Sequence, residues 1–182
     1  MYTIRKQVLP TVHSLCQDVN SNVRACICLQ LRFVAEGLGP ESVKSALLPS
    51  IVELASDEES IVRHASVQTI VYLLPHLNSD IIKSTISPLI KKSCDNALKS
   101  DVTVMCTIAE EFGKLAIGLE KSLSTSEKTW LIKFFKQLSQ VGILPNKDHK
   151  NYQVLFSIVI IILVINNKNL QQLTSVAVIQ QL

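Results

Sequence analysis

Glycine and aromatic residues are scarce in this sequence. Among its 182 residues are 5 glycines, and aromatic side chains account for 5%, whereas 47% of the residues are hydrophobic. A chain with many aliphatic residues and few glycines favours a packed helical fold over a disordered or β-rich one. The sequence also contains no glycine-rich loop of the kind that cradles phosphate groups.

Concentrated positive charge is absent as well. The chain has 18 basic and 15 acidic residues, for a formal net charge of +3, and its basic residues occur singly or in isolated pairs such as Lys91-Lys92. Binding to nucleic acid through bulk charge needs a continuous basic stripe. We therefore expect no nucleic-acid partner.

The cysteines form no metal-binding or disulfide pattern. There are five of them, an odd number without a CxxC pair, and the four histidines do not complete a zinc site. Most of the cysteines occupy apolar positions of helical patterns, which predicts small buried side chains kept reduced. The short start, Met1 to Lys6, shows no signal peptide. These features predict an intracellular, cytoplasmic protein without a metal or cofactor.

Catalytic constellations are missing too. No serine or cysteine nucleophile has a supporting histidine context, and acidic runs such as Glu110-Glu111 are typical of solvated helix faces. We expect a protein that is not an enzyme and has no small-molecule substrate.

What the sequence does contain is an internal repeat. The stretch from Leu9 to Leu38 reappears thirty-nine residues later, and a third step preserves the register through the next helix. The matched positions are Pro10, Pro49 and Pro88; Asp18 and Asp57; Arg24 and Arg63; and Phe33 and Tyr72. A fixed period of about 40 residues indicates stacked two-helix units.

The repeat predicts an all-α solenoid of three to four units. We place a solenoid domain at 1–145, with units at about 5–38, 40–77 and 79–119 and a partial unit at 124–142. The first unit lacks the front half of its first helix. We therefore expect the given sequence to start inside a repeat rather than at the start of one. A divergent loop and an Ile-rich, Gln-rich tail occupy 146–182.

Each unit repeats the same local signals. Pro49 lies inside an apolar helical pattern, so we expect a kink in that helix. The turns at Asp18 and Asp57 suit helix N-caps, with Glu58 and Glu59 in the first helical turn. An apolar stripe follows in each second helix: Val23, Ile27, Leu31, Val34 and Leu38, then Val62, Ser66, Ile70, Leu73 and Leu77.

The third and fourth units depart from this pattern. Asp101 follows Asp57 by forty-four residues, which indicates about five residues inserted between the helices, and Thr107 replaces the arginine. Ser124 and Glu127 have the spacing of a capping box that opens the fourth unit. For the tail at 152–182, three interpretations stay open: an alternative end that replaces a helix, an apolar cap on the last repeat, or a membrane anchor. Its apolar run of twelve residues is too short to span a bilayer, so membrane association is the least favoured.

The recurring Asp and Arg residues have a structural interpretation. An arginine side chain at Arg24 or Arg63 has the reach to bind a turn carboxylate of an adjacent repeat and to fix the register of the stack. We therefore predict a structural ladder of Asp18, Arg24, Asp57 and Arg63. The alternative is that the two arginines contact a partner protein.

A second set of residues points to protein binding. On the second helices, Arg32, Phe33 and Glu36 are expected to be exposed, as are the equivalent Val71, Tyr72 and Pro75. The aromatic pair either packs between repeats or forms a binding ridge. In the second case the predicted ridge comprises Arg32, Phe33, Glu36, His64, Gln68 and Tyr72, continued by Glu110, Glu111 and Lys114.

The Leu-Pro, Asp and Val-Arg positions, with the aliphatic ladder that follows them, resemble the HEAT-repeat family. More narrowly, the segment LPTVHSLCQDVNSNVRACICLQLRFVAEGLG resembles the HEAT-type regulatory subunits of serine/threonine-protein phosphatase 4. This resemblance implies a non-enzymatic scaffold that binds the catalytic subunit of protein phosphatase 4. The alternatives are a HEAT scaffold for transport or assembly with other cargo, and a truncated product without function.

Overall fold

The computed structural model describes residues 4–38 and 40–143, and the described residues form helices and no strand. The chain divides into two compact units, Met1–Leu131 and Ile132–Leu182. The predictions for the tail at 146–182 lie outside the described residues.

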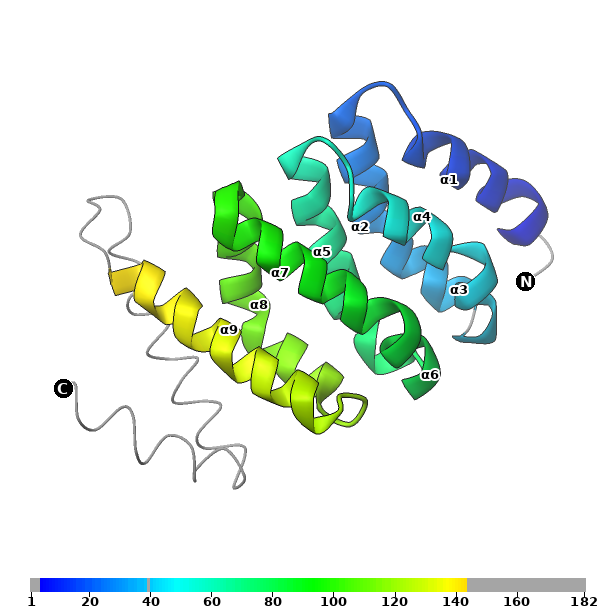
Figure 1. Cartoon of the computed structure of the whole chain (residues 1–182). Helices are drawn as coiled ribbons and strands as arrows, with labels where there is room; N and C mark the ends of the chain where they lie inside the picture. Colours follow the sequence, from blue (N-terminus) through cyan, green and yellow to red (C-terminus); the bar gives the residue numbers. More distant parts are fainter. Residues whose placement is uncertain (1–3, 39, 144–182) are drawn as a thin grey trace. The chain divides into compact units, whose positions relative to one another are not determined.

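The first unit is built from antiparallel helix pairs (Figure 1). The first pair is η1 (Ile4–Val8) with α1 (Leu9–Cys16), followed by α2 (Ser21–Leu38). The second is α3 (Pro40–Ala46) with α4 (Leu48–Leu54), followed by α5 (Ser60–Leu73) and η2 (Leu74–His76). The third is α6 (Ser79–Ile81), η3 (Ile82–Ile86) and α7 (Ser87–Ser100), followed by α8 (Val102–Glu120). The last helix, α9 (Thr125–Ile143), begins in the first unit and ends in the second.

The helices of the first unit form two layers. The first helices α1, α3–α4 and α7 follow one another in one layer, and the second helices α2, α5 and α8 follow one another in the other (Figure 1). Within the second layer, α2 packs against α5 and α5 packs against α8. This is the arrangement of a HEAT-type α-solenoid, as the repeat predicts.

Each first helix is interrupted just before its repeated proline. Pro10, Pro49 and Pro88 all stand in the first turn of a helix, namely α1, α4 and α7. Proline has no N–H to donate, so it is tolerated there, where the N–H groups lack helical partners anyway. The chain accommodates it with a π-helical turn before α1 and before α7, and with a break at Leu47 before α4. The kink expected at Pro49 is therefore present.

The core lies between the two layers. Its fully buried aliphatic side chains include Leu31, Ile70 and Ile108 from the second helices and Ile51, Leu54 and Ile90 from the first. Burying one such side chain contributes about 1.5–3 kcal/mol. The predicted stripe is buried in α5 from Val62 to Leu73. In α2, Leu31 and Leu38 are buried while the other predicted positions are half-buried.

The insertion in the third repeat enters a helix rather than a turn. Helix α4 ends at Leu54, three residues before Asp57, whereas α7 continues to Ser100, immediately before Asp101. Asp101 alone connects α7 to α8, and its side chain accepts a hydrogen bond from the Val104 N–H. The extra residues expected between the helices therefore lengthen α7.

The turn chemistry also differs from expectation. Asp57 is not the N-cap of α5, because its Oδ1 accepts the Glu59 N–H at 2.9 Å and the helix begins only at Ser60. Glu58 and Glu59 accordingly precede the helix instead of occupying its first turn. An aspartate three residues before a helix accepts a hydrogen bond within the turn rather than from the first turn of the helix.

The capping box at the start of α9 is present. The Ser124 N–H donates to Glu127 Oε2 at 2.8 Å, and the Glu127 N–H donates to Ser124 Oγ at 3.4 Å. The other carboxylate oxygen of Glu127 accepts from Ser87 Oγ at 3.0 Å, which connects the start of α9 to α7. Glu127 therefore completes the cap and also joins two successive repeats.

Candidate functional site: a groove between the second helices

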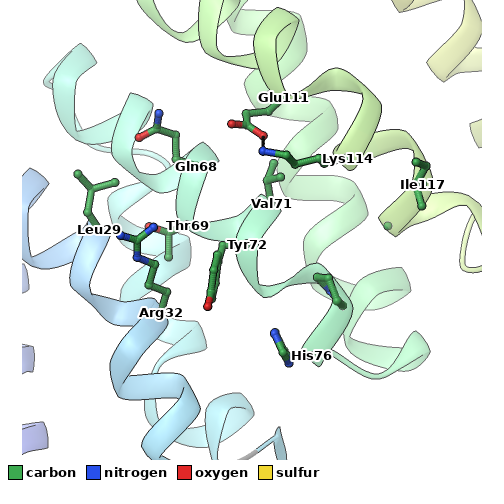
Figure 2. Close-up of a pocket in the computed structure, with 12 residues that line it drawn as sticks. Leu29, Arg32, Gln68, Thr69, Val71, Tyr72, His76, Glu111, Lys114 and Ile117 are labelled. Carbon is green, nitrogen blue, oxygen red and sulfur yellow. Dashed lines mark ion pairs between the residues drawn. The ribbon is translucent and has the colours of Figure 1, made fainter. Parts of the chain in front are cut away.

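A groove with a volume of about 610 Å³ runs across α2, α5 and α8 (Figure 2). The second helices alone, with the short η2, supply its walls. The lining residues are Leu29, Arg32, Gln68, Thr69, Val71, Tyr72, Pro75, His76, Glu111, Lys114, Ile117 and Gly118. The groove is thus a product of the repeat, because it forms where equivalent helix faces stand side by side.

Arg32 is held by two aromatic rings. Its guanidinium carbon lies 4.6 Å from the centroid of the Phe33 ring and 5.5 Å from that of Tyr72. A cation over an aromatic face is attracted by the ring's quadrupole, and the planar guanidinium group also stacks well. Phe33 and Tyr72 remain 52% and 37% exposed. The aromatic pair that repeats in the sequence therefore holds an arginine at the surface of the layer.

Tyr72 is itself fixed by a hydrogen bond to the neighbouring repeat. Its hydroxyl donates to Glu36 Oε1 on α2. This hydrogen bond, followed by partial desolvation and the negative charge of Glu36, raises the pKa of the Tyr72 phenol. The tyrosine is therefore neutral at physiological pH, and its hydrogen bond connects α5 to α2.

The α8 wall carries a closed ion pair. Lys114 Nζ lies 2.8 Å from Glu111 Oε2, one helical turn away. The Lys114 side chain is 74% exposed, and Glu111 Oε2 is buried and accepts no hydrogen bond from the described residues. Beside this ion pair, the apolar side chain of Ile117 is 59% exposed. The α8 side of the groove therefore offers apolar surface next to an ion pair.

The structure brings together only part of the predicted ridge. Arg32, Gln68 and Tyr72 line the groove, and Phe33 and Glu36 contact lining residues. His64 lies apart from them: its Nδ1 contacts Thr107 Oγ1 of the next repeat.

Two further positions differ from expectation. Val71, which we expected to be exposed, is only 5% exposed. Glu110 is exposed but does not line the groove, whereas its neighbour Glu111 does.

Sequence reasoning missed several lining residues, among them Leu29, His76 and Ile117. Each lies three or four positions from a ridge residue, since Leu29 precedes Arg32 by three and His76 follows Tyr72 by four. Residues at these spacings share one helix face. The helical phase of the ridge was therefore the signal that would have found them.

Away from the groove, the arginines connect consecutive repeats. Arg24 donates from Nε to Asp57 Oδ2 and from Nη2 to Asp57 Oδ1, both at 2.8 Å. Its Nη1 donates to the backbone carbonyl of Asp18 at 2.8 Å. Arg24 thus joins its own turn to the carboxylate of the following repeat in a bidentate pair.

Arg63 repeats this arrangement one step along. Its Nε donates to Asp101 Oδ2 at 2.7 Å, and its Nη1 donates to the Asp57 carbonyl at 2.6 Å. Ser60 Oγ adds a hydrogen bond to Asp101 Oδ1 at 2.5 Å. Asp101 departs from the thirty-nine-residue period that relates Asp18 to Asp57, yet its carboxylate accepts the hydrogen bond from Arg63.

The Arg–Asp contacts between repeats do not extend to Asp18 in the first repeat or to Thr107 in the third. The Asp18 carboxylate accepts the Asn20 N–H at 2.8 Å, and no ion pair reaches it within the part of the chain that the structure describes. At the third repeat, Thr107 stands where an arginine would be and contacts His64 instead. That the Arg–Asp contacts fix the register of the stack stays a prediction.

The surroundings of Asp57 and Asp101 lower the pKa values of both carboxyl groups. Burial raises the pKa of Asp57, but the hydrogen bonds from Arg24 and the Glu59 N–H, with the charges of Arg24 and Arg63, outweigh it and lower the pKa. For Asp101, burial likewise raises the pKa, and the hydrogen bonds from Ser60, Arg63 and the Val104 N–H outweigh it. Both carboxylates are therefore ionised at neutral pH.

The cysteines are all free thiols. Burial raises the pKa of Cys16 to about 11 and that of Cys28 to about 12. Thiols with such pKa values are poor nucleophiles.

Among the described residues, no group of three or more His, Cys, Asp or Glu side chains is placed to hold a metal ion. No helix within 4–38 or 40–143 has the length and apolar character that a membrane span requires.

Comparison with known proteins agrees with the fold. Residues 47–77, which cover α4, α5 and η2, match the family model of the HEAT repeat. Together with the stacked helix pairs, this match agrees with a HEAT-type α-solenoid fold.

The chain is similar to the human serine/threonine-protein phosphatase 4 regulatory subunit 4, with 37% identity over 153 residues. The alignment covers 84% of this chain and 18% of that protein. The mouse protein of the same name is 35% identical over 158 residues, covering 87% of this chain and again 18% of the relative. The chain therefore spans less than a fifth of the length of these relatives.

Proposed function

We propose that this chain is a non-enzymatic scaffold that binds the catalytic subunit of protein phosphatase 4. It would act as a regulatory subunit, or as a shorter relative of one, in the cytoplasm. The five free cysteines accord with a reducing compartment.

The observation that carries this proposal is the extent of the similarity. Identity of 37% extends over 84% of the chain, so the similar stretch reaches α2, α5 and α8, which form the groove. The named relatives are regulatory subunits of a phosphatase, and a protein of that kind acts by holding another protein. The groove supplies a partly apolar surface with exposed aromatic rings and an arginine, and such residues are enriched at protein interfaces.

The test is co-precipitation of the full chain with the purified phosphatase 4 catalytic subunit. We expect binding by the natural chain. A triple variant, Phe33→Ala, Gln68→Ala and Tyr72→Ala, should weaken it by at least tenfold, because buried aromatic side chains at an interface often contribute more than 1.4 kcal/mol each.

A matched control replaces three exposed residues of α7 in the other layer: Asp95→Ala, Asn96→Ala and Lys99→Ala. Circular dichroism checks that both triple variants keep their helices. Equal binding by the two triple variants would exclude the groove as the contact surface, and no binding by the natural chain would refute the proposal itself.

A further inference from the structure

We propose that the groove recognises an extended acidic segment of a partner protein, with a carboxylate of that segment bound by Arg32. An aliphatic side chain of the same segment would pack beside Ile117, which is exposed. This inference rests on the proposed function of the groove as a partner-binding surface, and it names the chemistry of what binds there.

The charges of the groove carry the argument. Lys114 is paired with Glu111 at 2.8 Å, and Glu36, the α2 carboxylate one turn from Arg32, accepts the hydroxyl of Tyr72 and keeps its own negative charge. Among the lining residues that the structure describes, Arg32 is the permanent charge without an ion-pair partner. A guanidinium group in a groove that forms no ion pair is available to bind an anionic group.

Arg32 is also short of hydrogen-bond acceptors. Its Nε is buried and donates to no acceptor in the described structure. A buried donor without an acceptor is costly, more so when the group is charged. A carboxylate that arrives at this guanidinium supplies acceptors in the geometry that its planar group prefers.

The position of Arg32 is set before any ligand arrives. The rings of Phe33 and Tyr72 hold the guanidinium at 4.6 and 5.5 Å, and Tyr72 is anchored to Glu36 in turn. A side chain that is already held loses less conformational freedom on binding. Figure 2 shows Arg32 beside Tyr72 on one side of the groove, with Lys114 and Ile117 on the α8 side.

The rest of the lining defines the ligand further. The groove crosses three helices, and Leu29, Pro75 and Ile117 give it apolar surface, which suits an extended peptide carrying an aliphatic residue. Nucleic acid is disfavoured, because tracking phosphates needs several cations, and among the described lining residues Arg32 is the one permanent cation without an ion-pair partner. An acidic peptide satisfies both the charge and the apolar surface.

The experiment measures fluorescence anisotropy of labelled synthetic peptides with the full chain. Each peptide keeps one leucine fixed and carries a single glutamate, which is moved through the remaining positions. A matched set carries glutamine in place of glutamate. We expect at least one glutamate peptide to bind roughly tenfold more tightly than its glutamine counterpart, since a hydrogen-bonded charge pair contributes about that factor.

The Arg32→Gln variant should lose this preference, whereas Lys83→Gln, which removes one exposed positive charge from η3 in the other layer, should keep it. Circular dichroism on both variants checks that the helices remain. Equal binding of all glutamate and glutamine peptides by the natural chain would overturn the proposal. A glutamate preference that survives in Arg32→Gln would overturn it too.

The two proposals fail in distinguishable ways. Phosphatase binding that needs Phe33, Gln68 and Tyr72, combined with no glutamate preference, would keep the proposed function and refute acid recognition. A glutamate preference without phosphatase binding would refute the function and keep the acidic ligand. Concentration-dependent dimerisation in sedimentation that Arg32→Gln abolishes would assign the groove to a second copy of the chain and overturn the peptide proposal.

Discussion

One arginine in each of the first two repeats joins its own turn to a carboxylate of the next repeat. The side chains of Arg24 and Asp57 are each 11% exposed, and those of Arg63 and Asp101 are 26% and 9% exposed. Ion pairs at fully exposed positions contribute little, but pairs this sheltered are costly to break from one side. The ladder is therefore expected to matter for stability even though it lies at the rim of the fold.

Replacing Asp57 by alanine should lower the free energy of unfolding by about 2 kcal/mol, because Arg24 and the Glu59 N–H both lose their acceptor. Urea denaturation followed by circular dichroism measures this change. Asp95→Ala, an exposed aspartate of α7, is the control and should change stability by less than about 0.5 kcal/mol. Equal effects of the two substitutions would mean that the Arg24–Asp57 contact adds nothing to the fold.

The same carboxylates predict an acid-sensitive fold. Because the pKa values of Asp57 and Asp101 lie below the ordinary 3.8 in the folded state, the folded protein holds these protons less tightly than the unfolded chain does. Their contribution is complete above the unfolded value and is lost as the pH falls from there through the lowered folded values. Urea titrations at pH 6, 4 and 3 should show falling stability below about pH 4.

In Asp57→Asn this fall should be shallower, since one of the two carboxylates is gone while Glu127, whose pKa is also lowered, is unchanged in both proteins. Identical pH profiles for the natural chain and the variant would contradict the assignment of the low pKa to Asp57.

At the scale of single helices, α8 offers a matched pair of glycines. A Cβ built at Gly118 would come within 2.7 Å of Leu74 Cδ1 and 2.9 Å of Leu74 Cβ, whereas one built at Gly113 meets nothing within 4 Å. Gly118 therefore permits the close approach of α8 to η2. Gly113 has no such role and only weakens the helix.

Gly118→Ala should destabilise the protein by about 1–3 kcal/mol through overpacking. Gly113→Ala should stabilise it by about 0.5–1 kcal/mol through helix propensity. Thermal or urea unfolding of the two variants gives the comparison. Stabilisation by both substitutions would show that η2 and α8 are not packed as closely as the structure has them.

The helices were predictable to the degree that their signals are local. The kink at Pro49 follows from the missing N–H, and the cap of Ser124 and Glu127 from its spacing. Where the inserted residues of the third repeat lie was not predictable, because the same residues can extend either a helix or a turn, depending on how they pack. In the structure they lengthen α7 to Ser100. The predicted cap at Asp57 was wrong for a related reason: an aspartate carboxylate accepts a backbone N–H in a turn as readily as at a helix start, and here it accepts that of Glu59.

At the scale of the first unit, stacking creates both stability and the groove. Helix α5 packs against α2 on one side and α8 on the other, so no second helix buries its apolar stripe alone. The groove exists only because these three helices stand in register. A surface of this kind forms only when several repeats are stacked, because no single repeat contributes all of its walls.

The sequence predicted the groove only in part, and the reason is geometric. The ridge residues Arg32, Gln68 and Tyr72 follow from the thirty-nine-residue period and their exposed helix face. His64 lies four positions before Gln68 and shares its helix face, but its Nδ1 contacts Thr107 Oγ1 of the next repeat and it does not line the groove. The burial of Val71 depends on how closely α8 approaches α5, which the sequence of α5 alone does not specify.

The measurement that tests the central claim most directly is hydroxyl-radical footprinting of the full chain with and without the phosphatase 4 catalytic subunit. Phe33 and Tyr72, which are 52% and 37% exposed in the free chain, report on the groove, and Trp130, which contacts Lys91 of α7, reports on a site outside the groove lining. We predict that the subunit lowers the oxidation rates of Phe33 and Tyr72 and leaves that of Trp130 unchanged. Protection of Trp130 with unaltered rates at Phe33 and Tyr72 would contradict the account, because the partner would then be held elsewhere than in the groove.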